Sequence, residues 1–305
     1  MADINQPILC GTDFSETSVE AANIAAAIAR RLGTRLVLVH VGAIRGLGRV
    51  DPVLIQSAMA EQQAGLDRET ARLRAQQVEV EAQLRSGSPF EQLVTAAVEA
   101  NARSIILGAV GHGLGHRLLI GSVAERTAEA SPVPTVIVRP GGNLLTWLKG
   151  EHTVKVLLGY DFSPASEAAL QWIGRLRQND ASCEINVVHL YWPAEAAKRF
   201  NYQETIRFGD NPEELQEPLR REIQERISQI VPVDSVRLTI QPVSGSPEGS
   251  LYEISHEQKV DLVVVGTHQR PGLGRFRFGS VSRAVVQHSK TSVVVVPPPD
   301  PERAN

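Results

Sequence analysis

The sequence predicts an α/β protein made of two tandem copies of one doubly wound, Rossmann-like domain, each with a five-stranded parallel sheet. Three observations lead to this prediction. The chain has 305 residues, about twice the usual length of one domain. Its sequence repeats once in the same order, and within each copy short runs rich in β-branched residues alternate with longer helical patterns. This alternation is typical of a parallel sheet that helices cover on both faces.

The second half of the chain repeats the first half. The segment ILCGTDFS that ends at Ser15 is answered by VLLGYDFS, which ends at Ser163. The five matched pairs are 8–15 with 156–163, 36–41 with 185–190, 86–89 with 244–247, 121–123 with 279–281, and 134–138 with 292–296. Five matches in the same order indicate a duplicated domain.

The two copies differ in length. The separation between matched residues is 148 at Asp13 and Asp161 but 158 at Gly121 and Gly279, which indicates an insertion of about ten residues in the second copy. We place the insertion in 192–218, which has no counterpart of similar composition.

The repeat also defines the predicted domain boundaries. We predict a first domain at 1–142, a linker at 143–151, a second domain at 152–298 and a tail at 299–305. The linker is rich in leucine and contains Trp147, so we expect it to pack against a domain. The proline-rich tail is expected to be disordered.

Each copy has five predicted strands, which are short and rich in β-branched residues. They are 8–12, 35–41, 78–84, 104–108 and 134–138 in the first copy, and 154–160, 184–190, 236–242, 261–266 and 292–296 in the second. Helices are predicted between them, in the first copy at 15–32, around Met59, Leu66 and Leu73, at 88–102 and at 122–130. A fold of this kind binds ligands beyond the carboxyl ends of its strands, where the strand order reverses.

Composition and charge exclude several classes of protein. Hydrophobic residues make up 42% of the chain and charged residues 21%, as in ordinary globular proteins. A formal net charge of −3 gives no electrostatic reason to expect nucleic acid or an anionic membrane as a partner. The sequence has neither a signal-peptide pattern nor a membrane-spanning apolar run, so we expect a cytoplasmic location. Cys10 and Cys183 are too few for a disulfide framework and are expected to be small core residues.

A group of glycines follows the fourth predicted strand. Gly108, Gly111 and Gly121-Ser122 have the spacing Gly-x2-Gly-x9-Gly-Ser. Glycines here can adopt positive φ and let a ligand approach the backbone, and a helix that begins at Ser122 presents free amides to a phosphate. The alternative is ordinary loop glycines with Ser122 as N-cap, completed to a capping box by Glu125. The Walker A and GxGxxG motifs are absent from the sequence.

The sequence resembles the universal stress protein family in three features taken together. They are the glycine spacing, the DFS that follows the first strand and the VHV that ends the second strand. The resemblance covers both copies and implies an adenine nucleotide hydrolase-like fold that binds ATP. Carried over by position, it implies that the first copy holds the nucleotide through Thr12, Asp13, Val41, Gly108, Gly111, Gly121, Ser122 and Val123. Asp13 could instead bond backbone amides at the start of the following helix. His40 and His189 are expected to be strand-end packing or hydrogen-bonding residues.

The second copy departs from this pattern. Gln269 replaces the second glycine, and a left-handed backbone there would cost about 1–2 kcal/mol. Arg283 replaces Glu125 of the predicted capping box, whereas Arg270, Arg275 and Arg277 could contact phosphates or form a solvated basic loop. We therefore expect a weaker second site, formed by Tyr160, Asp161, Leu190, Gly266, Gly279, Ser280 and Val281.

The function expected from the resemblance is an ATP-binding regulatory stress-response protein, with Mg²⁺ left open. Two alternatives remain: a nucleotide-independent interaction scaffold, or a slow ATPase. We expect no catalytic residues, because no nucleophile, base or metal site is marked out by spacing. His112 and His116 are expected to be phosphate neighbours and not metal ligands. The resemblance also implies that 134–138 and 292–296 pair within one chain, and it leaves a homodimer open.

Overall fold

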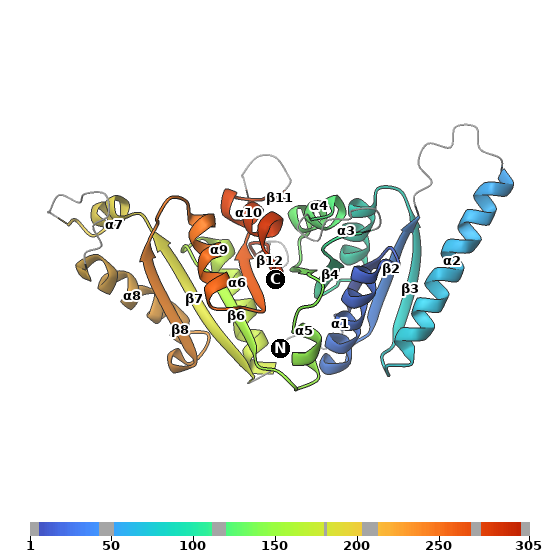
Figure 1. Cartoon of the computed structure of the whole chain (residues 1–305), viewed down its shortest axis with the longest axis horizontal. Helices are drawn as coiled ribbons and strands as arrows, with labels where there is room; N and C mark the ends of the chain where they lie inside the picture. Colours follow the sequence, from blue (N-terminus) through green and yellow to red (C-terminus); the bar gives the residue numbers. More distant parts are fainter. Residues whose placement is uncertain are drawn as a thin grey trace.

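The computed structural model describes residues 6–42, 52–111, 120–179, 182–202, 213–269 and 276–299. The strands of both copies join into one ten-stranded sheet that runs through the whole molecule, with helices on both faces (Figure 1). The predicted α/β class and the tandem arrangement are therefore confirmed.

The first copy contains five strands and four helices in its described part. They are β1 Ile8–Thr12, α1 Glu16–Leu32, β2 Leu36–Gly42, α2 Pro52–Arg74, β3 Val80–Ser86, α3 Pro89–Glu99, β4 Ser104–Gly108, α4 Ser122–Ala130 and β5 Thr135–Val138. Each predicted strand is present, with bounds that differ by two residues or fewer.

The second copy follows after the short helix α5 and carries additional elements. In order they are α5 Leu144–Leu148, β6 Val154–Gly159, α6 Pro164–Asn179, β7 Cys183–Tyr191, α7 Pro193–Arg199, α8 Glu213–Ser228, the 3₁₀ helix η1 Val233–Ser235, β8 Val236–Pro242, α9 Pro247–Glu257, β9 Leu262–Gly266, β10 His268–Gln269, β11 Phe276–Arg277, α10 Ser280–His288 and β12 Ser292–Val296. Helix α7 lies in the predicted insertion.

The strand order is the one expected of a doubly wound domain. It runs β3-β2-β1-β4-β5 in the first copy and β12-β9-β6-β7-β8 in the second, and within each of these two series all pairs are parallel. In the first copy the order reverses between β1 and β4, and in the second between β6 and β9. Ligands of such folds bind at these two reversal points.

The two copies are joined through their last strands. β5 and β12 pair antiparallel at the centre of the sheet, with Val136 opposite Val294. Just after β5, the backbone N–H of Arg139 donates to the hydroxyl of Ser292, at 3.0 Å. The pairing that the resemblance implied is confirmed, and it makes the two small sheets one.

The helices divide between the two faces of the sheet. Helices α1, α2, α5, α6 and α8 share one buried apolar core with inward-facing strand residues, whereas α3, α4, α9 and α10 share the other. Both cores continue from one copy into the other. Cys10 and Cys183 are buried in the first of these cores, as expected.

Local sequence explains where the helices begin and end. Ser15 caps α1 by accepting the amide of Ser18, at 3.3 Å, and Gly33 ends the helix in a left-handed conformation with φ 64°. Ser163 accepts the amide of Ser166 in the same way at the start of α6. The predicted linker forms α5, in which Leu144 and Trp147 are buried, so the linker does pack against the domains.

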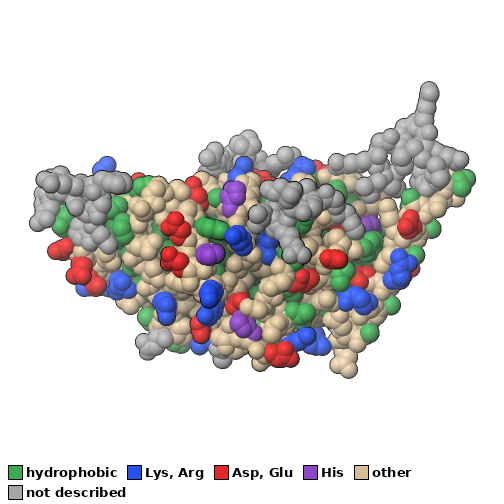
Figure 2. Space-filling model, in the orientation of Figure 1, with side chains coloured by type: hydrophobic (Ala, Val, Ile, Leu, Met, Phe, Trp, Pro, Cys, Tyr) green, Lys and Arg blue, Asp and Glu red, His purple; other side chains and the backbone are tan. Residues whose placement is uncertain are grey.

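The surface carries charges of both signs. Lys and Arg side chains are interspersed with Asp and Glu over the face shown in Figure 2. Among the helices that the structure describes, none has the length and apolar character to span a bilayer.

Candidate functional site

A cavity of about 320 Å³ opens at the carboxyl ends of β1, β2 and β4, where the strand order of the first copy reverses. Its volume is within the range of small-molecule sites. All eight residues expected to contact nucleotide in the first copy line it: Thr12, Asp13, Val41, Gly108, Gly111, Gly121, Ser122 and Val123. The sequence-based set therefore converges on one hollow, which the side chains of the described residues leave open.

One side of the cavity is the sharp turn between β1 and α1. The carboxylate of Asp13 accepts hydrogen bonds from the Ser15 amide, at 3.1 Å, and from the Ser15 hydroxyl, at 2.5 Å. Phe14 has φ 65°, and its counterpart Phe162 has φ 63°. A left-handed aromatic residue is uncommon, and strained backbone of this kind concentrates at functional sites. Asp13 thus caps the helix start and also lines the cavity.

The ring of Phe14 is held by the end of the second strand. It lies 4.4 Å from the His40 ring, centroid to centroid, and His40 Nδ1 donates to the carbonyl of Thr12, at 2.8 Å. In the second copy His189 donates in the same way to Tyr160, also at 2.8 Å. The histidines therefore fix the turn after the first strand, as expected of hydrogen-bonding residues at strand ends.

The glycine loop forms another wall of the cavity. The amide of Ala109 donates to the Val138 carbonyl, at 2.8 Å, and the amide of Gly121 donates to the Ala109 carbonyl, at 2.7 Å. This second bond brings the two ends of the loop together. The Thr17 hydroxyl also donates to the Val110 carbonyl, which ties the loop to α1.

The reason for the glycines differs from the one expected. Among the described glycines, those with positive φ are Gly33, Gly87, Gly141, Gly150 and Gly245, so Gly108, Gly111 and Gly121 do not use the left-handed backbone that glycine permits. A Cβ on Gly108 would lie 2.8 Å from the Thr17 carbonyl carbon, and one on Gly111 would collide with the Asp13 carboxylate. Close approach of α1 and of Asp13, not backbone conformation, requires glycine at these two positions.

Helix α4 starts at the cavity without a side-chain cap. Its N-cap is Gly121, with no side-chain hydrogen bond, and Ser122 is the first helical residue. The expected capping box is wrong, because the Glu125 carboxylate accepts instead from the Gln287 side-chain amide of the second copy, at 2.7 Å. The first amides of α4 and the positive end of its dipole therefore face the cavity, where an anion is favoured.

The second copy is built differently at the equivalent loop. Strands β10 and β11 form a small antiparallel hairpin in which Gln269 pairs with Phe276. Gln269 is thus extended, and the expected left-handed strain at this residue is wrong. Gly266 again marks a close approach, since a Cβ there would lie 2.5 Å from the carbonyl carbon of Ala165. Of the remaining expected residues, Tyr160 is buried, Asp161 and Ser280 are exposed, and Leu190, Gly279 and Val281 are partly buried.

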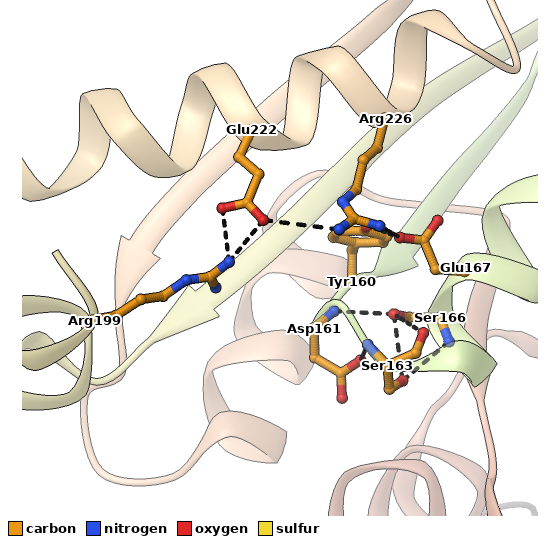
Figure 3. A network of polar contacts seen from close by, with 8 residues as sticks. All are labelled: Tyr160, Asp161, Ser163, Ser166, Glu167, Arg199, Glu222 and Arg226. Atoms are coloured by element: carbon orange, nitrogen blue, oxygen red, sulfur yellow. Dashed lines mark hydrogen bonds and ion pairs between the residues drawn. The ribbon is translucent and has the colours of Figure 1, made fainter.

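A polar network occupies the region beside the second copy's first strand (Figure 3). The Tyr160 hydroxyl donates to the Glu167 carboxylate, at 2.5 Å, and Arg226 donates to the same carboxylate, at 2.6 Å. Burial, and then the bond to Glu167, raise the pKa of the Tyr160 hydroxyl above its usual range. On the other side of the network, Glu222 accepts from Arg199, at 2.7 Å. In the first copy the residue equivalent to Tyr160 is Thr12, which is linked to Ser18 at 3.2 Å.

Several expected residues lie outside the described part of the chain. These are His112, His116, Arg270 and Arg275; the side chain of Arg277 and the end of the tail, 300–305, are likewise not described. Within the described ranges, no group of three or more His, Cys, Asp or Glu residues could hold a metal ion.

The apolar lining of the cavity was not foreseen. Val39, Pro89, Leu93, Leu107 and Val110 complete its walls. Alternation along β2 could have indicated Val39, because it lies two residues before Val41 on the same face of the strand. Nothing in the sequence indicated Pro89 and Leu93, since the packing of α3 brings them to the cavity.

Together, the fold and the site define a duplicated α/β protein with a ligand cavity at the reversal point of its first copy. The sequence profile of the universal stress protein family matches residues 5–139 and 153–297. The chain therefore belongs to the universal stress protein family.

Individual relatives agree with this assignment. A universal stress protein of Mycobacterium tuberculosis (strain H37Rv) is 26% identical over 240 residues, which cover 78% of this chain and 72% of the relative. Among solved structures, a universal stress protein of Archaeoglobus fulgidus has a TM-score of 0.70 at 18% identity and covers 98% of this chain and 100% of its own. A putative universal stress protein of Pseudomonas aeruginosa has a TM-score of 0.63 at 13% identity, covering 97% and 94%. Both structures share the two-copy fold.

Proposed function

We propose that this protein binds ATP in the cavity of its first copy and acts as a nucleotide-dependent regulator. The observation that carries the proposal is the convergence of Asp13, the glycine loop and the uncapped start of α4 on one hollow at the strand reversal. Such an arrangement suits a ligand with a hydrogen-bonding ring at one end and a polyphosphate at the other.

The chemistry of the lining assigns a role to each side. Thr12, Asp13 and Val41 would hold the adenine and ribose, because a carboxylate is a good acceptor for an amine or a sugar hydroxyl. Gly108, Gly111 and Gly121 would let the phosphates approach backbone amides, with Ser122 and Val123 at the helix start.

The second copy would bind nucleotide weakly or in altered geometry. Its loop forms the β10–β11 hairpin, and the bulky side chain of Tyr160 stands where the first copy has Thr12. We propose that the second copy contributes the shared sheet and the α10 contacts to α4 more than a binding site of its own.

The competing functions are a slow ATPase and a scaffold that binds no nucleotide. The regulator is favoured over an enzyme because His40, the histidine nearest the cavity in the described part of the first copy, is 9% exposed and bonded to the Thr12 carbonyl. His40 is not among the residues that line the cavity, so it is poorly placed to activate a water there.

The proposal is tested by denaturing the purified protein and identifying the released compounds by chromatography. Near-stoichiometric ATP is the expected result, and absence of any nucleotide, with no binding on titration, would support the scaffold. A second arm incubates the protein with ATP, with and without EDTA. Steady release of ADP would replace the regulator by a slow ATPase, and loss of binding in EDTA would show that Mg²⁺ accompanies the nucleotide.

A further inference from the structure

The first turn of α1 contacts two separate parts of the candidate nucleotide site. Its N-cap, Ser15, donates its hydroxyl to the Asp13 carboxylate, at 2.5 Å. Two residues later, the Thr17 hydroxyl donates to the Val110 carbonyl in the glycine loop. Val110 lines the cavity, whereas Thr17 is not among the lining residues. Thr17 therefore holds the loop from outside the cavity and would not touch a bound nucleotide.

This hydrogen bond fixes the direction of one peptide group. None of the described peptide bonds is cis. In a trans peptide the carbonyl oxygen and the N–H of the next residue point in opposite directions. Because the Val110 carbonyl points to Thr17, the N–H of Gly111 points away from α1. No backbone carbonyl of the described residues accepts a hydrogen bond from this amide.

The Gly111 amide lies beside the start of α4. A Cβ on Gly121, the N-cap of α4, would lie 3.7 Å from the Gly111 nitrogen, and both glycines line the cavity. The first amides of a helix have no partner within the helix and favour an anion. The Gly111 amide adds one more donor next to them, and neighbouring amides of this kind form a concavity that binds anions.

The second copy repeats the contact between helix and loop without the hydroxyl. Ala165 is the repeat equivalent of Thr17 and is 2% exposed. A Cβ on Gly266 would lie 2.5 Å from the Ala165 carbonyl carbon, and one on Gly108 would lie 2.8 Å from that of Thr17. Helix and loop are thus about equally close in the two copies, but the alanine has no hydroxyl with which to orient the loop.

The loop of the second copy is held in a different way. His268, the repeat equivalent of Val110, belongs to β10 and pairs with Arg277 of β11. Backbone pairing therefore orients the chain at this point, in place of a side chain from the preceding helix. The two copies differ at linked positions, because Thr17 accompanies the glycine loop and Ala165 accompanies the hairpin.

We propose that Thr17 is a positioning residue that makes the first copy's cavity select phosphorylated nucleotides over nucleosides. This inference rests on the proposed function, since it concerns the same cavity. The Thr17 hydroxyl holds the Val110 carbonyl toward α1 and so leaves the Gly111 amide available to a phosphate. Without the hydroxyl the peptide can turn and present its carbonyl oxygen to the phosphate, and glycine at position 111 makes this turn easy. The loss would fall on the phosphates and not on the adenosine.

The test compares ATP with adenosine in two variants of one residue. Thr17→Val keeps the shape of the side chain and removes the hydroxyl. It is expected to weaken ATP binding at least tenfold in titration calorimetry and to leave adenosine binding, measured by equilibrium dialysis, within twofold of the unaltered protein. Thr17→Ser restores a hydroxyl and should keep the ATP affinity within threefold. Equal losses for ATP and adenosine in Thr17→Val, or no recovery in Thr17→Ser, would overturn the proposal.

Thr34→Val is the matched control. The Thr34 hydroxyl also donates to a backbone carbonyl of another segment, that of Gln6, at 3.0 Å, but neither residue lines the cavity. The ATP affinity of this variant should stay within twofold of the unaltered protein. If Thr34→Val loses as much affinity as Thr17→Val, the loss is a general effect of removing such a hydroxyl and the proposal fails.

The orientation of the peptide is measured separately, in the nucleotide-free protein labelled with ¹⁵N-glycine. The amide signal of Gly111 is assigned by its absence from Gly111→Ala. It should shift clearly further in Thr17→Val than in Thr17→Ser, and equal shifts in the two variants would contradict the positioning role. If the unaltered protein binds no ATP, the nucleotide proposal fails and this one with it. If the unaltered protein binds ATP and Thr17→Val binds it equally well, only the role of Thr17 fails.

Discussion

The carboxylate of Asp13 occupies the space where a side chain on Gly111 would begin. Both residues line the first copy's cavity, and they lie side by side there although one follows β1 and the other follows β4. Their contact means that the glycine loop and the acidic turn are fitted to each other. A substitution at Gly111 is therefore expected to act on ligand binding, because it displaces the Asp13 side chain. A substitution elsewhere in the loop that meets backbone is expected to act on folding.

Gly111→Ala should weaken ATP binding without a large loss of stability. The added Cβ meets the end of a flexible side chain, so Asp13 can move aside, but it then leaves its position in the cavity. We expect a loss of about tenfold in affinity, or about 1.4 kcal/mol, measured by titration calorimetry. Gly142→Ala is the control, because a Cβ there meets ordinary contacts at 3.6 and 3.8 Å. Equal effects of the two substitutions would contradict the role of Asp13.

Gly108→Ala should act on folding. Its Cβ would lie 2.8 Å from the backbone of Thr17, which cannot move without shifting the start of α1. Overpacking of this kind typically costs about 1–3 kcal/mol. We expect a comparable loss for Gly266→Ala, which would clash with the Ala165 backbone in the second copy. Urea unfolding of both variants checks this, and a loss below that of Gly111→Ala would be inconsistent with it.

Arg139→Gln should weaken the junction of the copies. From the end of the first copy, the Arg139 guanidinium donates to the carbonyl of Val286, at 3.2 Å, in the last turn of α10. Removing a charged donor from buried carbonyls costs about 1–3 kcal/mol. The measurement is the free energy of unfolding in urea, with the exposed Arg68→Gln on α2 as control. If the two variants are equally stable, this interaction does not hold the copies together.

His189 should make the protein less stable in mild acid. Its pKa is lowered, chiefly by burial, from an ordinary value of about 6.5. Below that pH the unfolded chain binds a proton that the folded chain does not, so stability falls as the pH drops below about 6.5 and is unaffected by this group above it. Unfolding in urea at pH 7.5 and pH 5 measures the difference.

The variant His189→Asn isolates this contribution. The Asn amide can still donate to the Tyr160 carbonyl but does not titrate, so the stability difference between the two pH values should shrink. His256→Asn, on the exposed face of α9, serves as control. An unchanged pH dependence in His189→Asn would show that other groups cause it.

The architecture could be predicted from the sequence because it depends on local patterns and on the repeat. Apolar runs predicted each strand of the ten-stranded sheet to within two residues, and the resemblance to the family implied the pairing of 134–138 with 292–296, which is β5–β12. The eight residues of the first cavity were found through the resemblance to the family. They come together because five of them lie at or just after the ends of β1, β2 and β4, and the other three lie at the start of α4.

What could not be predicted depends on contacts between distant segments. Glu125 has the spacing of a capping box, yet it bonds Gln287, which lies 162 residues away. For the glycines of the loop we considered positive φ and the approach of a ligand, whereas the structure shows close approach of α1 to Gly108 and of Asp13 to Gly111. A cavity of about 420 Å³ between the two copies takes its walls from α1, α5 and α6, and no local pattern in the sequence links these helices.

The stoichiometry of ATP binding tests the central claim most directly. Titration calorimetry of the nucleotide-free protein should give about one tight site per chain, and Gly111→Gln, which copies the second loop into the first, should weaken that site at least several-fold. Two equal sites per chain, or an unchanged affinity in Gly111→Gln, would contradict the assignment of the nucleotide to the first copy's cavity.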